Sequence, residues 1–477
     1  MKPELLWDNF KALCAIPRPS KNEGKALDYI AQYGRDLKLE VIRDNIGNVI
    51  IRKPATPGME DRTPVILQGH ADMVPQKTPE SKHDFLKDSI ETIVEGDWMR
   101  ANDTTLGADN GIGVAAAMAV LADKNAEHGP LEVLVTTDEE TGMTGATNLE
   151  ANMLKGKILL NLDSEAEGEL YIGCAGGQDV TATFQIEYVP TAEDDIAMKV
   201  SVSGLRGGHS GMDINTGVAN ANKLLARVLK YSAANFEALL VDINGGSLRN
   251  AIPREAAATL VIDSEDEEEF REMISEFNEL LRVEYADVEP NLVVSVEKVG
   301  KPEQVFSEIC TDDIINAVQG CPNGVIRMNP SIPGLVQTSS NMASIVTKDG
   351  KVYVHFLLRS ASESEKEDLA SSIESVMRLA EAEVEIDNGY PGWRPNPKSA
   401  ILKTLSNTYR DMYGKEPKVM AIHAGLECGI MAGIYPDWDM VSFGPTIMNP
   451  HSPQERVNIP SVERFYDLLL ATLKNIE

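Results

Sequence analysis

The sequence predicts an α/β domain that is interrupted by an inserted α+β domain. The chain of 477 residues is longer than a single hydrophobic core usually supports, so two domains are expected. Apolar strands alternate with helices over residues 1–180, whereas the strands after residue 181 alternate apolar and polar side chains. The pattern of the first part returns after residue 391. Residues 391–477 are therefore expected to rejoin residues 1–180.

The first domain begins with helix patterns and continues with apolar strands. Apolar residues recur at helical spacing over 5–13, which predicts an amphipathic helix. In the next helix pattern, Ser20 and Glu23 have the spacing of a capping box. Strands are expected at 47–53, 63–69, 131–137, 157–163 and 169–174, and a small-residue helix is expected at 110–123. Strands that alternate with helices indicate a largely buried sheet.

The inserted domain has the pattern of a sheet with helices on one face. Strands are expected at 181–189, 196–204 and 256–263, and amphipathic helices at 215–230 and 264–283. A related strand–helix unit follows at 351–382. The Pro/Gly-rich stretch 388–397 is interpreted as a linker, after which a helix at 401–414 and a strand at 439–444 restore the α/β pattern.

Charge and cysteine usage exclude several classes of partner. Asp and Glu number 74 against 44 Lys and Arg, for a net charge of −30, which argues against nucleic acid or an anionic membrane as a partner. No apolar stretch has the length of a membrane span or of a signal peptide. The five cysteines are scattered and lack CxxC spacing, which predicts a reduced, cytoplasmic protein without a thiolate metal cluster.

Residues of metal-ligand type recur where successive strands end. Taken singly, each has an ordinary interpretation: a buried core histidine, a helix N-cap or a solvated acid. Their repetition at five points favours a metal site, because divalent ions bind oxygen and imidazole ligands. The residues are His70 and Asp72 after 63–69, Asp109 at the start of the small-residue helix, Glu139 and Glu140 after 131–137, Asp163 after 157–163, and His451 in "MNPHSP".

Three adjacent acids stand in "VTTDEETG", where like charges repel. Such a triplet is either a solvated loop or the surroundings of a positive group. Glu139 and Glu140 belong to the ligand-type residues above, whereas Asp138 is expected to be structural.

Several motifs resemble the dinuclear zinc aminopeptidase/aminoacylase superfamily and, within it, the bacterial aminoacyl-histidine dipeptidases. They span nearly the whole chain and include "LQGHADMVPQK", "TLGADNGIGVAAAMAVL", "TTDEETGMTGA", "NLDSEAEGELYIGCAGG", "GGHSGMDI", "NAIPRE", "VQTSSN", "HAGLEC" and "FGPTIMNPHSPQERV". The resemblance implies an α/β/α catalytic domain with a mixed central sheet, formed by 1–180 and 391–477. It also implies an inserted α+β lid and dimerisation domain at 181–390.

The resemblance also implies two divalent metal ions, zinc by expectation, with cobalt or manganese as alternatives. Asp109 would bridge the two ions. His70 and Asp163 would complete the ligands of one ion, and Glu140 and His451 those of the other. Five side chains with one shared carboxylate leave each ion room for a bridging water.

Two acids close to these ligands would then hold no metal. Glu139 resembles the general base that takes a proton from the bridging water and passes it to the leaving amine. Asp72 resembles the carboxylate that orients a ligating imidazole, here His70. Residues i and i+2 of an extended segment face the same way, which fits that role. The alternative for Asp72 is a simple loop acid.

The inserted domain is expected to bind substrate. His209 in "RGGHSG" resembles the lid histidine that polarises the substrate carbonyl, in its own subunit or a partner's; the alternative is a turn with an incidental histidine. Arg359 resembles a group that binds the substrate's carboxylate through its guanidinium fork, against the alternative of a surface arginine at a strand end. Asn250, His423 and Gly425 match further substrate contacts.

The resemblance implies a cytoplasmic enzyme that hydrolyses small dipeptides, including Xaa-His dipeptides such as carnosine, as a homodimer formed through the lid. An N-acyl amino acid deacylase of the same superfamily would use the same metals. A non-catalytic binding protein is the alternative of another class. It predicts loss of a ligand or of the base, and all six residues are present.

Overall fold

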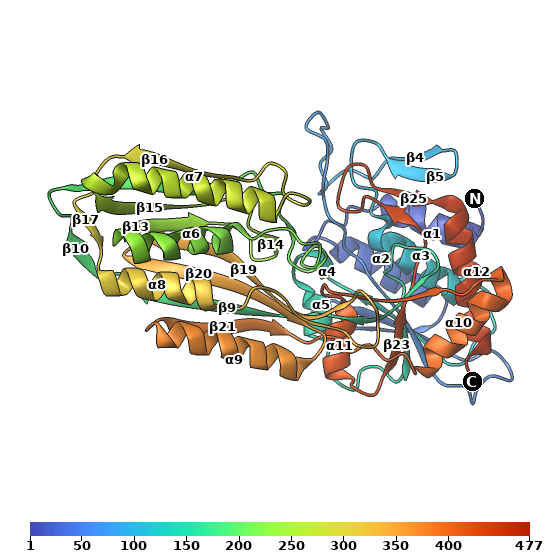
Figure 1. Ribbon diagram of the computed structural model, residues 1–477. Helices are drawn as coiled ribbons and strands as arrows, with labels where there is room; N and C mark the ends of the chain where they lie inside the picture. Colours follow the sequence, from blue (N-terminus) through green and yellow to red (C-terminus); the bar gives the residue numbers. More distant parts are fainter. The chain divides into compact units, whose positions relative to one another are not determined.

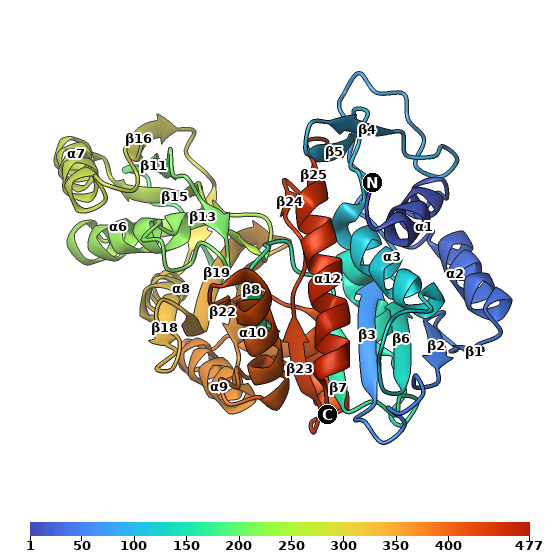
Figure 2. The same ribbon diagram turned by 90° about the vertical axis from the view of Figure 1, so that its right-hand side faces the viewer.

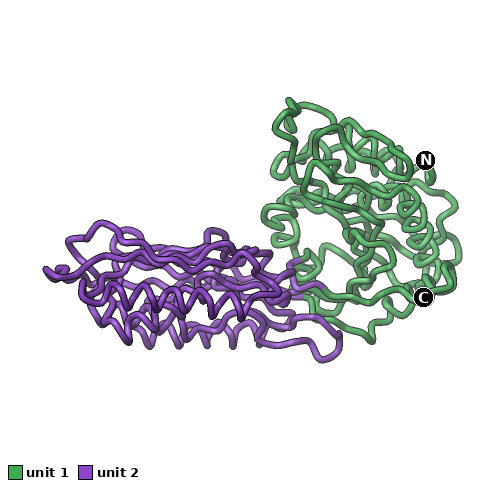
Figure 3. Tube along the Cα trace, turned by 45° about the horizontal axis from the view of Figure 1, so that its top comes forward, with its two compact units in different colours: residues 1–174, 393–421, 426–477 green, residues 175–392, 422–425 purple.

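The structure is a computed structural model that describes all 477 residues as two compact units. Unit 1 comprises Met1–Cys174, Trp393–Ala421 and Leu426–Glu477, and unit 2 comprises Ala175–Gly392 and Ile422–Gly425 (Figure 3). The boundaries that we expected at 180/181 and 390/391 thus fall at 174/175 and 392/393. The short segment 422–425, which we expected in the first domain, groups with unit 2.

Unit 1 contains an eight-stranded mixed sheet, as predicted. Strand β3 pairs in parallel with β6 and β7, and β23 pairs in parallel with β7, whereas β2 is antiparallel to both β1 and β6. Strand β23 comes from the C-terminal segment, so both ends of the chain build one sheet. In sheet order the strands are β1 (Glu40–Arg43), β2 (Val49–Lys53), β6 (Leu131–Thr136), β3 (Val65–His70), β7 (Ile158–Asn161), β23 (Asp439–Ser442), β8 (Glu169–Cys174) and β22 (Lys418–Ile422).

Helix α3 (Ala108–Ala122) is the centre of the helical layer of unit 1. Its alanines and glycines leave it buried along almost its entire length, and it packs against α1, α12 and β3 (Figure 2). The other helices of unit 1 are α1 (Glu4–Cys14), α2 (Gly24–Asp36), α4 (Glu139–Gly142), α5 (Thr144–Thr147), α10 (Ala400–Tyr413), α11 (Glu427–Ile434) and α12 (Ile459–Asn475). A separate small sheet contains β4 (Thr92–Glu95), β5 (Trp98–Ala101), β24 (Ile447–Met448) and β25 (Arg456–Asn458).

The capping box predicted for Ser20 and Glu23 is wrong. Helix α2 has no side-chain cap. The Ser20 hydroxyl donates to Asp72 Oδ2 at 2.8 Å, and the Glu23 carboxylate accepts the Thr137 hydroxyl and the Asp138 N–H. Buried N–H and hydroxyl groups need acceptors. The Glu23 carboxylate accepts those of the loop after β6 and is therefore not available to cap α2.

Unit 2 contains an antiparallel nine-stranded sheet. Its strands follow the order β16 (Val293–Val299), β11 (Asp195–Ser203), β15 (Ala256–Asp263), β13 (Leu239–Gly245), β19 (Val336–Lys348), β20 (Lys351–Ser360), β9 (Gly176–Gln185) and β21 (Glu383–Tyr390), and β18 (Gly324–Met328) pairs with β19. The strand expected at 181–189 is divided: β9 ends at Gln185, and β10 (Tyr188–Pro190) pairs instead with β17 (Gln304–Phe306).

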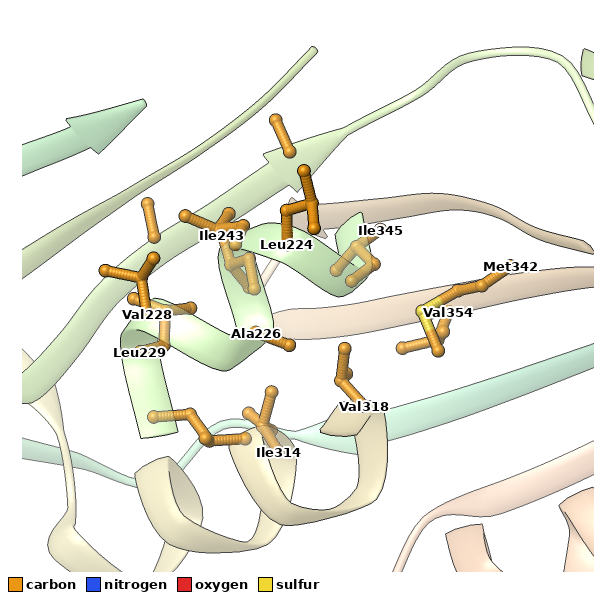
Figure 4. Packing of buried hydrophobic residues seen from close by; sticks show 14 of the residues in the cluster. Leu224, Ala226, Val228, Leu229, Ile243, Ile314, Val318, Met342, Ile345 and Val354 are labelled. Atoms are coloured by element: carbon orange, nitrogen blue, oxygen red, sulfur yellow. The ribbon is translucent and has the colours of Figure 1, made fainter. Parts of the chain in front are cut away.

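Four helices share one hydrophobic core with the sheet of unit 2, as predicted for an α+β domain (Figure 1). Val228 and Leu229 of α6 and Ile314 and Val318 of α8 are buried in the same core as Ile243, Ile345 and Val354 of the strands (Figure 4). The helices are α6 (Ala221–Phe236), α7 (Glu267–Glu284), α8 (Glu308–Gly320) and α9 (Glu363–Leu379). Helix α6 begins later than expected because Asn220 caps it, accepting the N–H groups of Asn222 and Lys223.

None of the helices combines the length and the apolar composition that a membrane-crossing segment needs. All five cysteines are free, and four of them are buried.

Candidate metal centre

The strand ends of unit 1 bring the ligand-type residues to one edge of the sheet. Strands β6, β3 and β7 are parallel neighbours, so their carboxyl ends meet at the same edge. His70 is the last residue of β3, and Asp163 follows β7 by two residues. Glu139 and Glu140 follow β6 and begin α4, and Asp109 stands at the start of α3.

Asp109 is shared by two groups of ligand-type side chains. In the first group, His70 Nε2 lies 3.2 Å from Asp109 Oδ1 and 3.3 Å from Asp163 Oδ1. In the second, His451 Nε2 lies 3.1 Å from Asp109 Oδ2 and 3.0 Å from Glu140 Oε2. The structure therefore brings all five predicted ligand side chains together, with one Asp109 oxygen facing each histidine.

The donor set fits divalent cations. One ligand atom each from His70, Asp109 and Glu140 lie within 4.8 Å of one another, and these nitrogen and oxygen donors suit such ions. Glu140 Oε1 is buried without a hydrogen-bond partner. A buried polar atom normally has a partner, so this oxygen fits a site in which a cation is its partner.

The electrostatics of the cluster lead to the same conclusion. Burial raises the pKa of Asp163 to about 7 and that of Glu165 to about 8, and nearby carboxylates add to both shifts. Burial likewise raises the pKa of Glu139 well above its usual range. These acids crowd around the imidazoles of His70 and His451, and bound cations would offset the repulsion between the carboxylates.

Asp72 is fully buried beneath this centre. Its Oδ1 accepts the N–H of Glu139 at 3.0 Å, and its Oδ2 accepts the N–H of Glu140 at 3.2 Å. His70 Nδ1 lies 3.4 Å from Oδ1. Burial alone would raise the pKa of Asp72, but the contacts with His70, the Glu139 N–H and the Ser20 hydroxyl hold it at about 2. Asp72 is thus no solvated loop acid: it fixes the His70 imidazole and the backbone of both glutamates.

Asp138 shapes the turn that presents the two glutamates. Its φ of 50° is left-handed, and its carboxylate accepts the hydroxyls of Thr141 and Thr144. The three acids therefore differ in their surroundings: Asp138 closes the turn, while Glu139 and Glu140 begin α4 at the candidate centre.

The predicted substrate-binding residues all belong to unit 2. His209 forms strand β12 (Gly208–His209) with Gly208 and pairs with β14 (Ala251–Ile252). Its Nδ1 accepts the N–H groups of Gly211 and Met212, each at 3.1 Å. Burial and then Arg359 lower the pKa of His209, which favours the neutral imidazole. With Nδ1 accepting, the neutral ring carries its proton on Nε2 and can donate from there.

Arg359 and His423 lie beside the turn that follows His209. Arg359 is buried, with Nε 3.3 Å from Ser210 Oγ and Nη1 3.1 Å from the Tyr390 hydroxyl, so the surface alternative does not hold. His423 Nε2 lies 2.7 Å from Ser339 Oγ. Burial, with a smaller effect of Arg359, lowers the pKa of His423 to about 3, so its imidazole is neutral.

The other two predicted residues of unit 2 differ in their surroundings. Asn250 is exposed and is linked to the His209 turn through its carbonyl oxygen, which accepts the N–H of Ser210 at 2.8 Å. Gly425 ends the segment 422–425, which also contains His423.

Three further buried residues lie near the candidate centre and were not predicted from the sequence: Arg18, Glu427 and Glu455. Glu427 Oε2 accepts hydrogen bonds from Gln68 Nε2 at 2.6 Å and Thr136 Oγ1 at 2.8 Å, which ties α11 to β3 and β6. Glu455 lies four residues after His451, which is the one sequence signal that could have indicated it.

Comparisons with known proteins show the family and the fold of this chain. The pattern of peptidase family M20/M25/M40 matches residues 66–475. The cytosol non-specific dipeptidase of Escherichia coli is 44% identical over 476 residues, covering 100% of this chain and 98% of the relative. The crystal structure of aminoacylhistidine dipeptidase from Vibrio alginolyticus is 47% identical, with a TM-score of 0.95 and coverage of 100% and 97%. An aminopeptidase of Bacillus cereus shares the fold, with a TM-score of 0.59, 15% identity and coverage of 99% and 98%.

Proposed function

The chain belongs to peptidase family M20/M25/M40, and from this premise we infer that it is a metal-dependent enzyme that hydrolyses dipeptides. The observation that carries the proposal is the pair of ligand groups that share Asp109. Two relatives that exceed 40% identity and span the whole chain are named as dipeptidases.

His70 and Asp163 would hold one divalent ion, Glu140 and His451 would hold a second, and the Asp109 carboxylate, which faces both histidines, would serve both. Zinc is the proposed ion, and cobalt and manganese suit the same nitrogen and oxygen donors. When bound, such ions polarise the scissile carbonyl and make a water molecule acidic enough to attack near neutral pH.

Glu139 accepts the proton of the attacking water and delivers it to the amine that leaves. Its carboxylate holds no ligand position, and Asp72 fixes its backbone N–H. Asp72 also holds the His70 ring through Nδ1, which leaves Nε2 for the metal.

The residues of unit 2 bind the substrate. His209 donates from Nε2 to the carbonyl oxygen as negative charge develops there. Arg359, with a guanidinium fork that matches a carboxylate, binds the C-terminal carboxylate of the dipeptide. Asn250, His423 and Gly425 complete the contacts.

Replacing His209 by alanine is expected to lower kcat about 10²–10³-fold, because one donor to the developing oxyanion is lost. Steady-state kinetics with a dipeptide measures the effect. His355→Ala is the matched control: His355 is a half-buried histidine of the same unit whose Nδ1 lies 3.0 Å from Ser344 Oγ. An unchanged kcat for His209→Ala would remove His209 from the mechanism.

The substrate class is decided by assay of the zinc-loaded protein. Carnosine and Gly-His should be cleaved, together with other dipeptides, and N-acetyl amino acids should be cleaved slowly or not at all. Cleavage of the acetylated compounds alone would replace the dipeptidase proposal by the deacylase alternative. If the protein binds no metal when zinc is added and cleaves neither class of compound, the non-catalytic binding protein would be the remaining alternative.

The enzyme works in the cytoplasm as a homodimer formed through unit 2. Its five free cysteines and the cytosolic relative support the compartment. Strand β18 supports the dimer, because it pairs only with β19 and exposes Val325, Ile326 and Met328. Sedimentation equilibrium tests the dimer, and the mass of a single chain would contradict it.

A further inference from the structure

The backbone that carries Asp109 is held from two sides by buried charged side chains. Glu455 contacts its N–H groups and Arg18 contacts its carbonyl side, and both side chains are almost completely buried. Neither residue belongs to the ligands, the base or the substrate contacts proposed above. We call Arg18 and Glu455 the positioning pair.

Glu455 accepts four consecutive backbone N–H groups at the start of α3. Its Oε2 receives the N–H of Leu106 at 2.7 Å and of Gly107 at 2.9 Å, and its Oε1 receives those of Ala108 at 2.8 Å and Asp109 at 3.2 Å. The first N–H groups of a helix lack partners within the helix, and an ionised carboxylate can accept several of them. Glu455 is four residues from His451, so it joins the loop of one ligand to the backbone of another.

Arg18 makes the corresponding connection to the loop of His70. Its Nη1 donates to the carbonyl oxygens of Ala71 at 3.0 Å and Asp72 at 3.1 Å, and its Nη2 donates to that of Gly107 at 2.5 Å. The rigid fork of one guanidinium therefore spans the exit of β3 and the start of α3.

Gly107 makes this close approach possible. Its φ of 68° is left-handed, and a Cβ atom at this position would lie 2.6 Å from Arg18 Nη2 and 2.8 Å from the sulfur of Met73. Only glycine fits without displacing Arg18 from its carbonyl partners.

We propose that Arg18 and Glu455 are positioning residues that set the Asp109 carboxylate between His70 and His451. Through Arg18, the Asp109 backbone is fixed to the loop of His70; through Glu455, it is fixed to the loop of His451. The two connections together hold three ligand-bearing segments at the separation that two metal ions require. The inference rests on the proposed metal centre.

The test compares zinc binding by Glu455→Gln and Arg18→Lys with that of the unsubstituted protein. Glutamine presents an NH₂ group to backbone donors, and lysine keeps the charge but not the fork. Each variant should bind zinc about 10–100-fold more weakly, as found when groups that orient metal ligands are removed. Competition with a chromophoric chelator measures the affinity. The visible spectrum of the cobalt-loaded protein should also change, because it reports the arrangement of the ligands.

Glu132→Gln is the matched control. Glu132 is a buried acid of the same unit that accepts the N–H groups of Lys155 and Gly156 and contacts Arg52, at the opposite ends of the strands. It should unfold more easily without a change in zinc affinity or cobalt spectrum. If Glu455→Gln does not fold, Glu455→Asp, which keeps the charge at a shorter reach, takes its place.

The outcomes separate the two proposals. An unsubstituted protein that binds no metal overturns the proposed function. A protein that binds two zinc ions and cleaves dipeptides, with variants that bind zinc as tightly and keep the cobalt spectrum, overturns the positioning role. Equally weakened zinc binding by Glu132→Gln would also overturn the positioning role, because loss of any buried acid of unit 1 would then weaken zinc binding.

Discussion

Replacing Glu139 by glutamine is expected to lower kcat about 10²–10⁴-fold while both metal ions remain bound. Glutamine has nearly the same shape as glutamate but cannot accept the proton of the attacking water. The backbone N–H at this position keeps its bond to Asp72, so Glu140 should keep its place. Steady-state kinetics with a dipeptide, combined with elemental analysis of the same preparation, gives both quantities.

An exposed acid of unit 1 supplies the control. Glu150→Gln removes the same charge at the surface and should leave kcat unchanged. If Glu139→Gln retains activity, Glu139 is not the general base. Loss of a metal ion together with the activity would instead assign Glu139 to the ligands.

Replacing Asp109 by alanine is expected to remove both metal ions and all measurable activity. The two oxygens of this carboxylate face His70 and His451 separately, so each group of ligands loses a member. Asp163→Ala changes only the group of His70 and should leave one ion bound. Elemental analysis after dialysis gives the stoichiometry, and circular dichroism shows whether the variants are folded.

The ratio of bound metal distinguishes a shared from an unshared carboxylate. No ion in Asp109→Ala and one ion in Asp163→Ala is the expected pattern. Two ions retained by Asp109→Ala would contradict the bridging role, and none in both variants would mean that the ions bind only together.

The fold class and the gathering of ligand-type side chains at one edge of the sheet could be predicted because their signals are local. The apolar runs that form β3, β6 and β7 are bounded by polar residues, and parallel strands must deliver those residues to one edge. Asp109 stands at the start of a helix whose many small residues indicate that the helix is buried. The order of the strands, in contrast, depends on pairings between segments far apart in the sequence.

The supporting residues could not be predicted for the same physical reason. Arg18 and Glu455 form hydrogen bonds with backbone groups of other segments. Every residue type has the same backbone groups, so such partners cannot be recognised from the sequence. Ser20 and Glu23 satisfy the spacing of a capping box and yet bond to the loops after β3 and β6. A spacing rule identifies hydrogen-bond partners within one turn of a helix. It cannot identify partners that are distant in the sequence and meet only in the folded chain.

The composition of the central sheet has a consequence for biosynthesis. Asp109 and His451 are 342 residues apart, and β23 and α12 come from the last part of the chain. Unit 2 is almost contiguous, so it can fold on the ribosome while its N-terminal neighbour is still unfinished. Unit 1 must wait for the final segment to complete its sheet and its ligand set. The chemistry proposed for this centre can therefore begin only when the chain is essentially finished.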